Sequence, residues 1–307
     1  MLRCVQCHVE LKIRVMNPSF IAATHDRQPA RSTSTVPKPF GEQLRHWRQH
    51  RRFSQLDLAQ VAAISTRHLS FVETGRSVPS REMVLRLSER LDIPLRERNT
   101  LLVAAGYAPM YRERRLDDPA LSSVRQAVEL ILKSHEPYPA IAIDRYWNLV
   151  DANSVVPLLL ANCDPALLQP PVNVFRLSLH PKGMAPQIAN LAQWRDHLFE
   201  RLRQQIAATA DPVLVALLEE LKSYPVPEGA GVQLDGEHAG IVMPFQFSTP
   251  AGVLNFISTI TIFGTPIDVT LQELAIEAFF PADEFTKQAL QTMLNQKSMQ
   301  KPISEEF

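Results

Sequence analysis

The chain has 307 residues, of which 45% are hydrophobic and 21% charged, so it is long enough to build more than one packed core. It contains no apolar run of about 18 residues or more, and its amino terminus lacks a basic-then-apolar export signal. We therefore expect a cytoplasmic protein that makes no membrane contact.

The charge is divided unevenly along the chain although basic and acidic residues are equally numerous, with 32 of each. Residues 1–115 contain 20 Lys+Arg and 10 Asp+Glu, whereas residues 116–307 contain 12 and 22. Eighteen of the first 20 cations are Arg, the side chain better suited to bidentate contacts with phosphate and guanine. This division predicts a polyanionic partner for the first part only.

Residues 1–38 are predicted to be a disordered tail, because the stretch from Thr24 to Pro39 is polar and rich in Pro, Ser and Thr. Cys4, Cys7 and His8 form the pattern C-x-x-C-H, which marks c-type haem attachment in exported proteins. No export signal or haem-burying domain accompanies it, and Cys163 lies far away. We interpret the pattern as chance and expect no cofactor and no metal.

From Phe40 to Gly106 the sequence predicts five short helices separated by tight turns. The first has an apolar stripe of Phe40, Leu44 and Trp47, and its other face is expected to present four arginines: Arg45, Arg48, Arg51 and Arg52. Ser54 is the predicted N-cap of the second helix, whose inward-facing residues are expected to be Leu56, Ala59 and Ala63.

Ser65 is the predicted N-cap of a third helix, from Thr66 to Thr74, in which Leu69 and Val72 face inward and which Gly75 ends. A fourth helix is expected to start near Ser80, with Val84, Leu87 and Leu91 inside. Pro94 is expected at the first position of a fifth helix that closes at Gly106.

The second and third helices, joined by a tight turn with small residues nearby, predict a helix-turn-helix. In this arrangement the amino-terminal residues of the second helix of the pair reach base edges in the major groove. Here the candidate base-reading residues are Thr66, Arg67, His68 and Ser70, and Arg67 is the one expected at guanine. Phe71 could either pack in the core or touch a thymine methyl group.

The stretch FSQLDLAQVAAISTRHLSFVETGRSVPSREMVLRLSERLDIP resembles the XRE-type (Cro/repressor-like) helix-turn-helix family. The resemblance implies a lambda-repressor-like all-α domain that binds an operator in double-stranded DNA. It also implies that Gln55 and Arg76 contact phosphates, which set the register on DNA while base contacts specify the sequence. Proteins of this kind commonly bind two half-sites, so we expect a homodimer.

Beyond a charged linker the pattern changes to helices and strands in mixed order, which favours an α+β domain. A helix is expected to bury Leu121, Val124, Val128, Ile131 and Leu132, and a hairpin to join residues 140–143 to residues 147–150. Residues 185–222 are predicted to be helical with a break at Asp211-Pro212. Strands are predicted at Ile241–Phe247 and Val253–Phe263. Thr270 and Glu273 predict a capping box for a helix running into Phe279, and a last helix begins near Asp283.

Nothing in this part predicts an enzyme. None of its seven glycines lies in a phosphate-binding pattern, and H-E-x-x-H and G-x-S-x-G are absent. His180, His197 and His238 are scattered along the sequence. We therefore expect no catalytic residues.

The segments GYAPMYRERRLDDPAL, HEPYPAIAIDRYWNLVDAN, NVFRLSLHPKG and TIFGTPIDVTLQELAIEAFFPADEFT are similar to the MmyB-like bacterial transcription regulators. The resemblance implies a carboxy-terminal PAS-like domain, with a small sheet and helices around an internal apolar cavity, that senses a ligand. The candidate pocket residues are large apolar groups with two possible polar partners: Trp147, Asn153, Phe175, His180, Trp194, Phe256 and Phe263.

We therefore expect a disordered tail (1–38), a DNA-binding domain (39–107), a linker (108–119), a PAS-like ligand-binding domain (120–295) and a carboxy-terminal tail (296–307). The expected function is a sequence-specific transcription regulator whose second domain senses an apolar small molecule, such as a fatty acid. In the alternative interpretation, the acidic second domain docks a protein partner.

Overall fold

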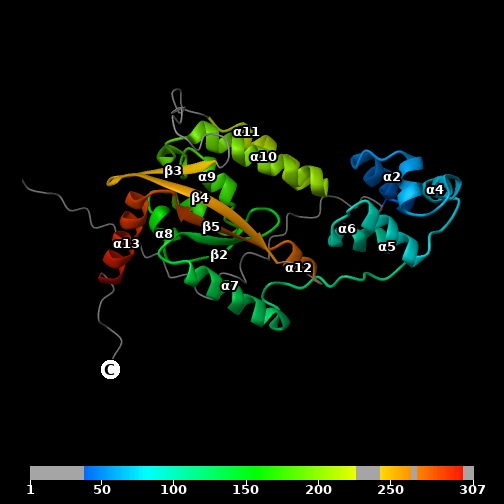
Figure 1. Ribbon diagram of the computed structural model, residues 1–307, viewed down its shortest axis with the longest axis horizontal. Helices are drawn as coiled ribbons and strands as arrows, with labels where there is room; N and C mark the ends of the chain where they lie inside the picture. The colour runs from blue at the N-terminus through cyan, green and yellow to red at the C-terminus, as the bar shows by residue number, and fades with distance from the viewer. Residues whose placement is uncertain (1–37, 226–242, 264–267, 300–307) are drawn as a thin grey trace, which may run out of the picture.

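The computed structural model describes residues 38–225, 243–263 and 268–299, which form a helical part and a larger mixed part (Figure 1). Several predicted features lie outside these residues. They are the amino-terminal tail, which contains Cys4, Cys7 and His8; the start of the strand predicted from Ile241; the end of the carboxy-terminal tail; and His238.

Five helices form the first part: α2 (Phe40–His50), α3 (Gln55–Val61), α4 (Thr66–Glu73), α5 (Arg81–Arg90) and α6 (Leu95–Ala104). As predicted, the hydroxyls of Ser54, Ser65 and Ser80 cap α3, α4 and α5 by accepting hydrogen bonds from backbone N–H groups of the first turn. Gly75, with a φ of 73°, follows α4 in the left-handed conformation that glycine adopts without strain. The five-helix prediction is confirmed.

The core of this part corrects three details of the prediction. In α3 the inward-facing residues are Leu58, Ala59 and Ala62, whereas Leu56 is 64% exposed and Ala63 is also exposed. The predicted inward face of this helix therefore contained Leu56, whereas the buried leucine is Leu58, two positions later. Arg48 is buried rather than on the solvent face, because it is paired with Glu73. Pro94 is the cap residue before α6 and not its first residue.

The mixed part contains fifteen elements in the described residues. The helices are η1 (Pro119–Leu121), α7 (Ser122–Ser134), α8 (Val156–Leu159), η2 (Pro165–Leu168), α9 (Val174–Leu179), η3 (Ala185–Gln187), α10 (Leu191–Thr209), α11 (Pro212–Lys222), α12 (Val269–Gln272) and α13 (Glu284–Met299). The strands are β1 (Ala140–Ile143), β2 (Leu149–Ala152), β3 (Pro244–Thr249), β4 (Gly252–Ile262) and β5 (Ala275–Pro281).

The five strands form one antiparallel sheet in the order β2-β1-β5-β4-β3. Alternate residues of β1 point to opposite faces, as the period of a strand requires. Ile141 and Ile143 enter a large core with α8 to α11, while Ala140 and Ala142 enter a smaller core with α7. Figure 1 shows α7 on one side of the sheet and α10 and α11 on the other. The α+β prediction is confirmed.

Three predictions for this part are wrong. Residues 275–281 form the strand β5 between β1 and β4, and not a helix. The helix before it, α12, has four residues and is capped by Asp268 rather than by Thr270. On α7, Ile131 is 45% exposed, whereas Val128 and Leu132 are buried. The predicted break between α10 and α11 and the predicted hairpin of β1 and β2 are both present.

Within the described residues, hydrogen bonds join the two parts at two places. The C-terminal end of α10 lies against α2, where the backbone carbonyls of Ala207 and Ala208 accept hydrogen bonds from Arg51. At the second place, Arg96 of α6 forms a bidentate ion pair with Glu273, which follows α12.

Candidate functional site

The candidate DNA-reading residues lie at the start of α4, which Figure 1 shows at the outer side of the helical part, away from the sheet. Leu69 and Val72 fix the helix by burying its inner edge. Of the four predicted base-reading residues, Arg67 is exposed, and the other three are half-buried: Thr66, His68 and Ser70. The start of α4 therefore presents polar side chains to an open surface.

Phe71 organises two of the basic residues near α4. Its ring is half-buried, and the guanidinium carbon of Arg67 lies 5.3 Å from the ring centroid while that of Arg76 lies 6.0 Å from it. Cation–π contact at this distance limits the conformations of both arginines. The ring thus connects the residue expected at a base with one expected at a phosphate.

Gln55, the other predicted phosphate contact, belongs to a buried network. Its side-chain N–H donates to Glu73 Oε2 at 2.8 Å, and Arg48 donates to both oxygens of the same carboxylate at 2.6 and 3.0 Å. Arg48 also donates to the carbonyl of Phe53 at 2.9 Å. The network joins α2, the start of α3 and the end of α4, so Gln55 is held in place before any DNA is present.

The mixed part contains an apolar cavity of about 90 Å³ between the sheet and helices α8, α9 and α10. Of its seventeen lining residues, three carry a polar group: Ser178, Glu277 and Trp194, whose indole has one N–H. The others are apolar: Pro139, Ile141, Leu149, Val156, Leu159, Leu160, Val174, Phe175, Leu177, Met184, Leu198, Phe245, Phe256 and Phe279.

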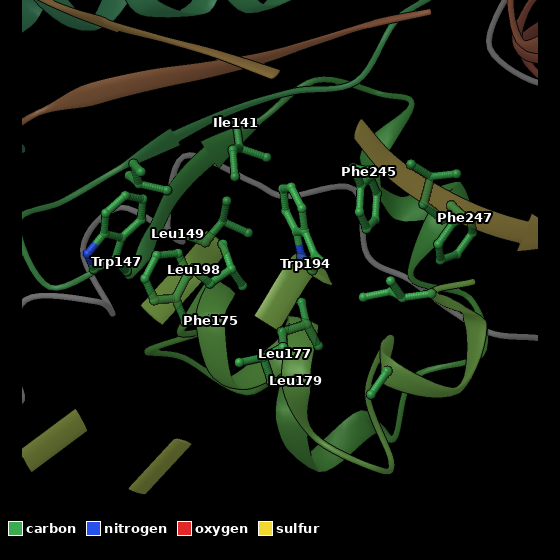
Figure 2. Packing of buried hydrophobic residues seen from close by; sticks show 14 of the residues in the cluster. Ile141, Trp147, Leu149, Phe175, Leu177, Leu179, Trp194, Leu198, Phe245 and Phe247 are labelled. Carbon is green, nitrogen blue, oxygen red and sulfur yellow. The ribbon is translucent and has the colours of Figure 1, made fainter. Parts of the chain in front are cut away.

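Each polar group of the cavity has a partner in the protein. The indole N–H of Trp194 donates to Ser178 Oγ at 3.0 Å, and Arg201 donates to Glu277 Oε1 at 2.8 Å. Figure 2 shows Trp194 between Phe245 on β3 and the aliphatic side chains of Ile141 and Leu149. A wall with its polar groups already paired favours an apolar occupant.

Three of the seven predicted pocket residues line this cavity: Phe175, Trp194 and Phe256. Trp147 does not line it but stacks on Phe175 with ring centroids 4.1 Å apart. Asn153 is buried and donates to the carbonyls of Leu132 and Tyr138.

The other two lie elsewhere. His180 packs against Tyr224, and Phe263 packs with the core under α7 on the opposite face of the sheet. Sequence reasoning missed Glu277 and Phe279, because both lie on the strand that was predicted to be a helix.

Other reactive side chains of the described residues are held in unreactive settings. Burial raises the pKa of the Cys163 thiol to about 11, so the thiol stays protonated at neutral pH. Burial, and then the charge of Arg201, lower the pKa of His197. Within residues 38–225, 243–263 and 268–299, His, Cys, Asp and Glu form no group that could hold a metal. No helix in that part of the chain is long and apolar enough to cross a bilayer.

Two family models match the chain. Residues 39–101 match a helix-turn-helix domain, and residues 124–293, more than half of the chain, match the MmyB-like transcription regulator ligand binding domain. No curated protein is similar enough in sequence to count as a relative. A solved structure of an RNA-binding light-oxygen-voltage receptor has 13% identity and a TM-score of 0.24 over 83% of this chain and 63% of its own. So low a TM-score supports no conclusion.

Proposed function

The chain belongs to the MmyB-like transcription regulators, and on that premise we propose that it reads an operator sequence with the start of α4 and takes an apolar molecule into the cavity beside Trp194. The family makes it a DNA-binding regulator with a ligand-binding domain, and not an enzyme. The operator, the class of ligand and the residues that contact them are our proposals.

The exposed start of α4 supports the proposal for DNA. Arg67 would take the O6 and N7 atoms of a guanine, a contact worth about 1–3 kcal/mol of discrimination, with Thr66, His68 and Ser70 at neighbouring positions. Gln55 and Arg76 would hold phosphates. We propose a dimer on two half-sites about 34 Å apart, acting in the cytoplasm.

Titrations of operator and random DNA at several salt concentrations test these roles. Arg67→Ala should weaken operator binding more than random binding and relax specificity at one base pair. Arg76→Ala should weaken both alike and reduce the salt slope by about one unit, since one phosphate contact is lost. Equal losses on both DNAs for Arg67→Ala would exclude base reading by this residue.

The apolar lining of the cavity is the observation that supports the ligand class. A cavity of 150 Å³ lined by aliphatic and aromatic residues is known to admit benzene, and this one, at about 90 Å³, is smaller. A fatty acid or another long apolar molecule would therefore have to enlarge it. We propose residues 120–295 as the unit that binds this molecule, 39–107 as the DNA-binding unit and 108–119 as the linker.

Mass spectrometry of organic extracts of the purified protein, with thermal shifts in benzene, 1-dodecanol and dodecanoate, tests the ligand class. At least one probe should raise Tm. Leu177→Phe, which adds bulk to the cavity wall, should abolish the shift. Leu130→Phe makes the same change at an exposed position and should leave it intact. Absence of an extracted molecule together with absence of any shift would count against an apolar ligand.

A further inference from the structure

Helix α10 connects the apolar cavity with the DNA-binding part of the molecule. Its 19 residues span about 28 Å at 1.5 Å per residue. Near its start, Trp194 and Leu198 line the cavity. At its end, Ala210 adopts the left-handed conformation and packs against the core of the five-helix part. In Figure 1, α10 extends from the sheet toward α2.

Two basic residues at the end of α2, His50 in its last position and Arg51 directly after it, hold the end of α10 through its backbone. Arg51 donates to the carbonyls of Ala207 and Ala208 at 3.0 and 2.9 Å, and His50 Nε2 donates to the carbonyl of Ala207 at 2.6 Å. The last carbonyls of a helix lack intrahelical partners and carry partial negative charge, so cationic donors suit them. Arg51 also donates to the carbonyls of Leu91 and Asp92 after α5. One guanidinium thereby joins helix ends from both parts of the protein.

The middle of α10 is tied to residues that border the cavity. Arg201 pairs with the cavity-lining Glu277 and lies 5.6 Å from the ring centroid of Trp147. The Trp147 indole N–H donates to Gln205 at 2.6 Å, and its ring stacks on the cavity-lining Phe175. Trp147 has a φ of 64°, which a bulky residue adopts only where its surroundings impose it.

The same region of α10 reaches the second contact between the parts. Gln205 donates to the carbonyl of Arg145 at 2.7 Å. The Arg145 guanidinium binds both Asp211, which follows α10, and Glu273. Glu273 in turn holds Arg96 of α6. Both contacts with the DNA-binding part therefore depend on where α10 lies.

We infer that α10 transmits occupancy of the cavity to the DNA-binding part: a ligand larger than about 90 Å³ displaces Trp194 and Leu198, and the end of α10 then moves against Arg51 and His50. This inference rests on the proposed ligand cavity. Close-packed interiors do not deform continuously, so enlarging the cavity requires one of its walls to shift. Among the elements that line the cavity, α10 is the one whose end is bonded to α2.

A matched pair of cavity variants tests the inference without any ligand. Leu198→Ala and Leu159→Ala remove the same atoms from the same cavity, but Leu198 lies on α10 and Leu159 on α8. In the full-length protein, Leu198→Ala should speed hydrogen exchange at the amides of Arg51, Arg52 and Ala210 by at least about threefold relative to Leu159→Ala. If Leu198→Ala fails to fold, Leu198→Val and Leu159→Val replace the pair. Equal exchange in the two variants would overturn the inference.

A second pair tests the coupling itself. In the native protein, saturating 1-dodecanol should change the operator Kd by a factor of at least about five, in either direction, which is within the usual range for allosteric coupling. The measured quantity is the ratio of the Kd with 1-dodecanol to the Kd without it. Arg51→Ala should bring the ratio close to one. Arg45→Ala, which removes an exposed arginine of α2 without a contact to α10, should leave it unchanged. Because the ratio compares one variant with itself, a general loss of DNA affinity in Arg51→Ala does not affect it.

The outcomes separate the two proposals. We call the contact of His50 and Arg51 with the end of α10 the junction. If 1-dodecanol binds and Arg51→Ala keeps the native ratio, the inference of transmission through the junction is wrong, while the proposal of a ligand cavity is still supported. If no apolar probe binds the native protein, the ligand proposal fails, and the exchange experiment with Leu198 and Leu159 still decides whether the cavity wall controls the junction.

Discussion

Arg48 shows how a single charged residue can be misassigned from sequence alone. Its position in α2 is compatible with the basic solvent face, yet it is 8% exposed and bound to the carboxylate of Glu73, 25 residues away. No local pattern indicates such a partner, because the pairing depends on how α2 crosses α4. The capping serines were predictable, since each cap depends on residues within one turn.

The buried pair leads to a prediction for stability. Glu73→Gln leaves the guanidinium of Arg48 buried without its countercharge, so the free energy of unfolding should fall by about 3–5 kcal/mol. Glu89→Gln removes the same charge from an exposed position of α5 and should change it by less than about 0.5 kcal/mol. Urea denaturation measures both. Equal losses would show that Glu73 does not stabilise Arg48.

At the scale of elements, the backbones of α2 and α4 lie close together where Gly41 faces the end of α4. A Cβ atom added to Gly41 would lie 2.4 Å from the carbonyl oxygen of Glu73 and 2.6 Å from that of Val72. Both neighbours are backbone atoms, so the clash cannot be relieved by turning a side chain. Glycine is needed at this position for close approach.

Gly41→Ala should therefore destabilise the protein by about 1–3 kcal/mol, although the same change normally stabilises a helix. Because α4 has to move to admit the methyl group, operator affinity should fall as well. Thermal denaturation and operator titration check the two effects. Gln49→Ala, at an exposed position of α2, is the control and should alter neither. A Gly41→Ala protein as stable as the native one would mean that α2 and α4 lie further apart.

Prediction of elements succeeded where helix periodicity and turn residues agree, as in α5 and in the hairpin of β3 and β4. It failed at β5, whose sequence AIEAFFP contains strong helix formers after an apparent capping box. The strand forms because β1 and β4 pair with it on both sides. That pairing depends on the tertiary fold and has no local signal in the sequence. Because β5 was predicted to be a helix, Glu277 and Phe279 were not recognised as cavity residues.

The candidate site likewise divides into a predictable and an unpredictable part. The start of α4 could be located from the caps and turn of a local motif. In contrast, three of the seven predicted pocket residues line the cavity and four do not, because from sequence each aromatic residue could equally belong to any core. Trp147 and Asn153 were predicted to line the pocket, but both are buried beside other partners: Trp147 stacks on Phe175, and Asn153 donates to main-chain carbonyls. These partners follow from the tertiary fold and have no local sequence signal.

At the scale of the whole molecule, the boundary between the parts contains a carboxyl group in an unfavourable setting. Glu97 of α6 lies near Arg145, Asp211 and Glu273. Burial first, and then the neighbouring carboxylates, raise the pKa of Glu97, although the charges of Arg145 and Arg96 oppose the shift. A carboxyl with a raised pKa costs stability when ionised, at a pH above its folded pKa. That cost disappears as the pH falls below its ordinary value of 4.5.

Glu97→Gln removes this cost and should raise Tm at pH 7 by about 1–3 °C. The gain should shrink as the pH is lowered through the carboxyl range, because the native side chain then becomes neutral as well. Melting curves at pH 7 and near pH 4 provide the comparison. Glu82→Gln, on an exposed turn of α5, should show no such pH-dependent gain. A lower Tm for Glu97→Gln at pH 7 would mean that the charged form is stabilised.

The hydrogen bonds that Arg51 and His50 make to α10 end on main-chain carbonyls. Any residue at positions 207 and 208 supplies the same two oxygens, provided that its side chain is small enough or points away. The connection between the two domains therefore depends on the main-chain path of α10 and on the two donors, and not on the identity of the side chains at positions 207 and 208.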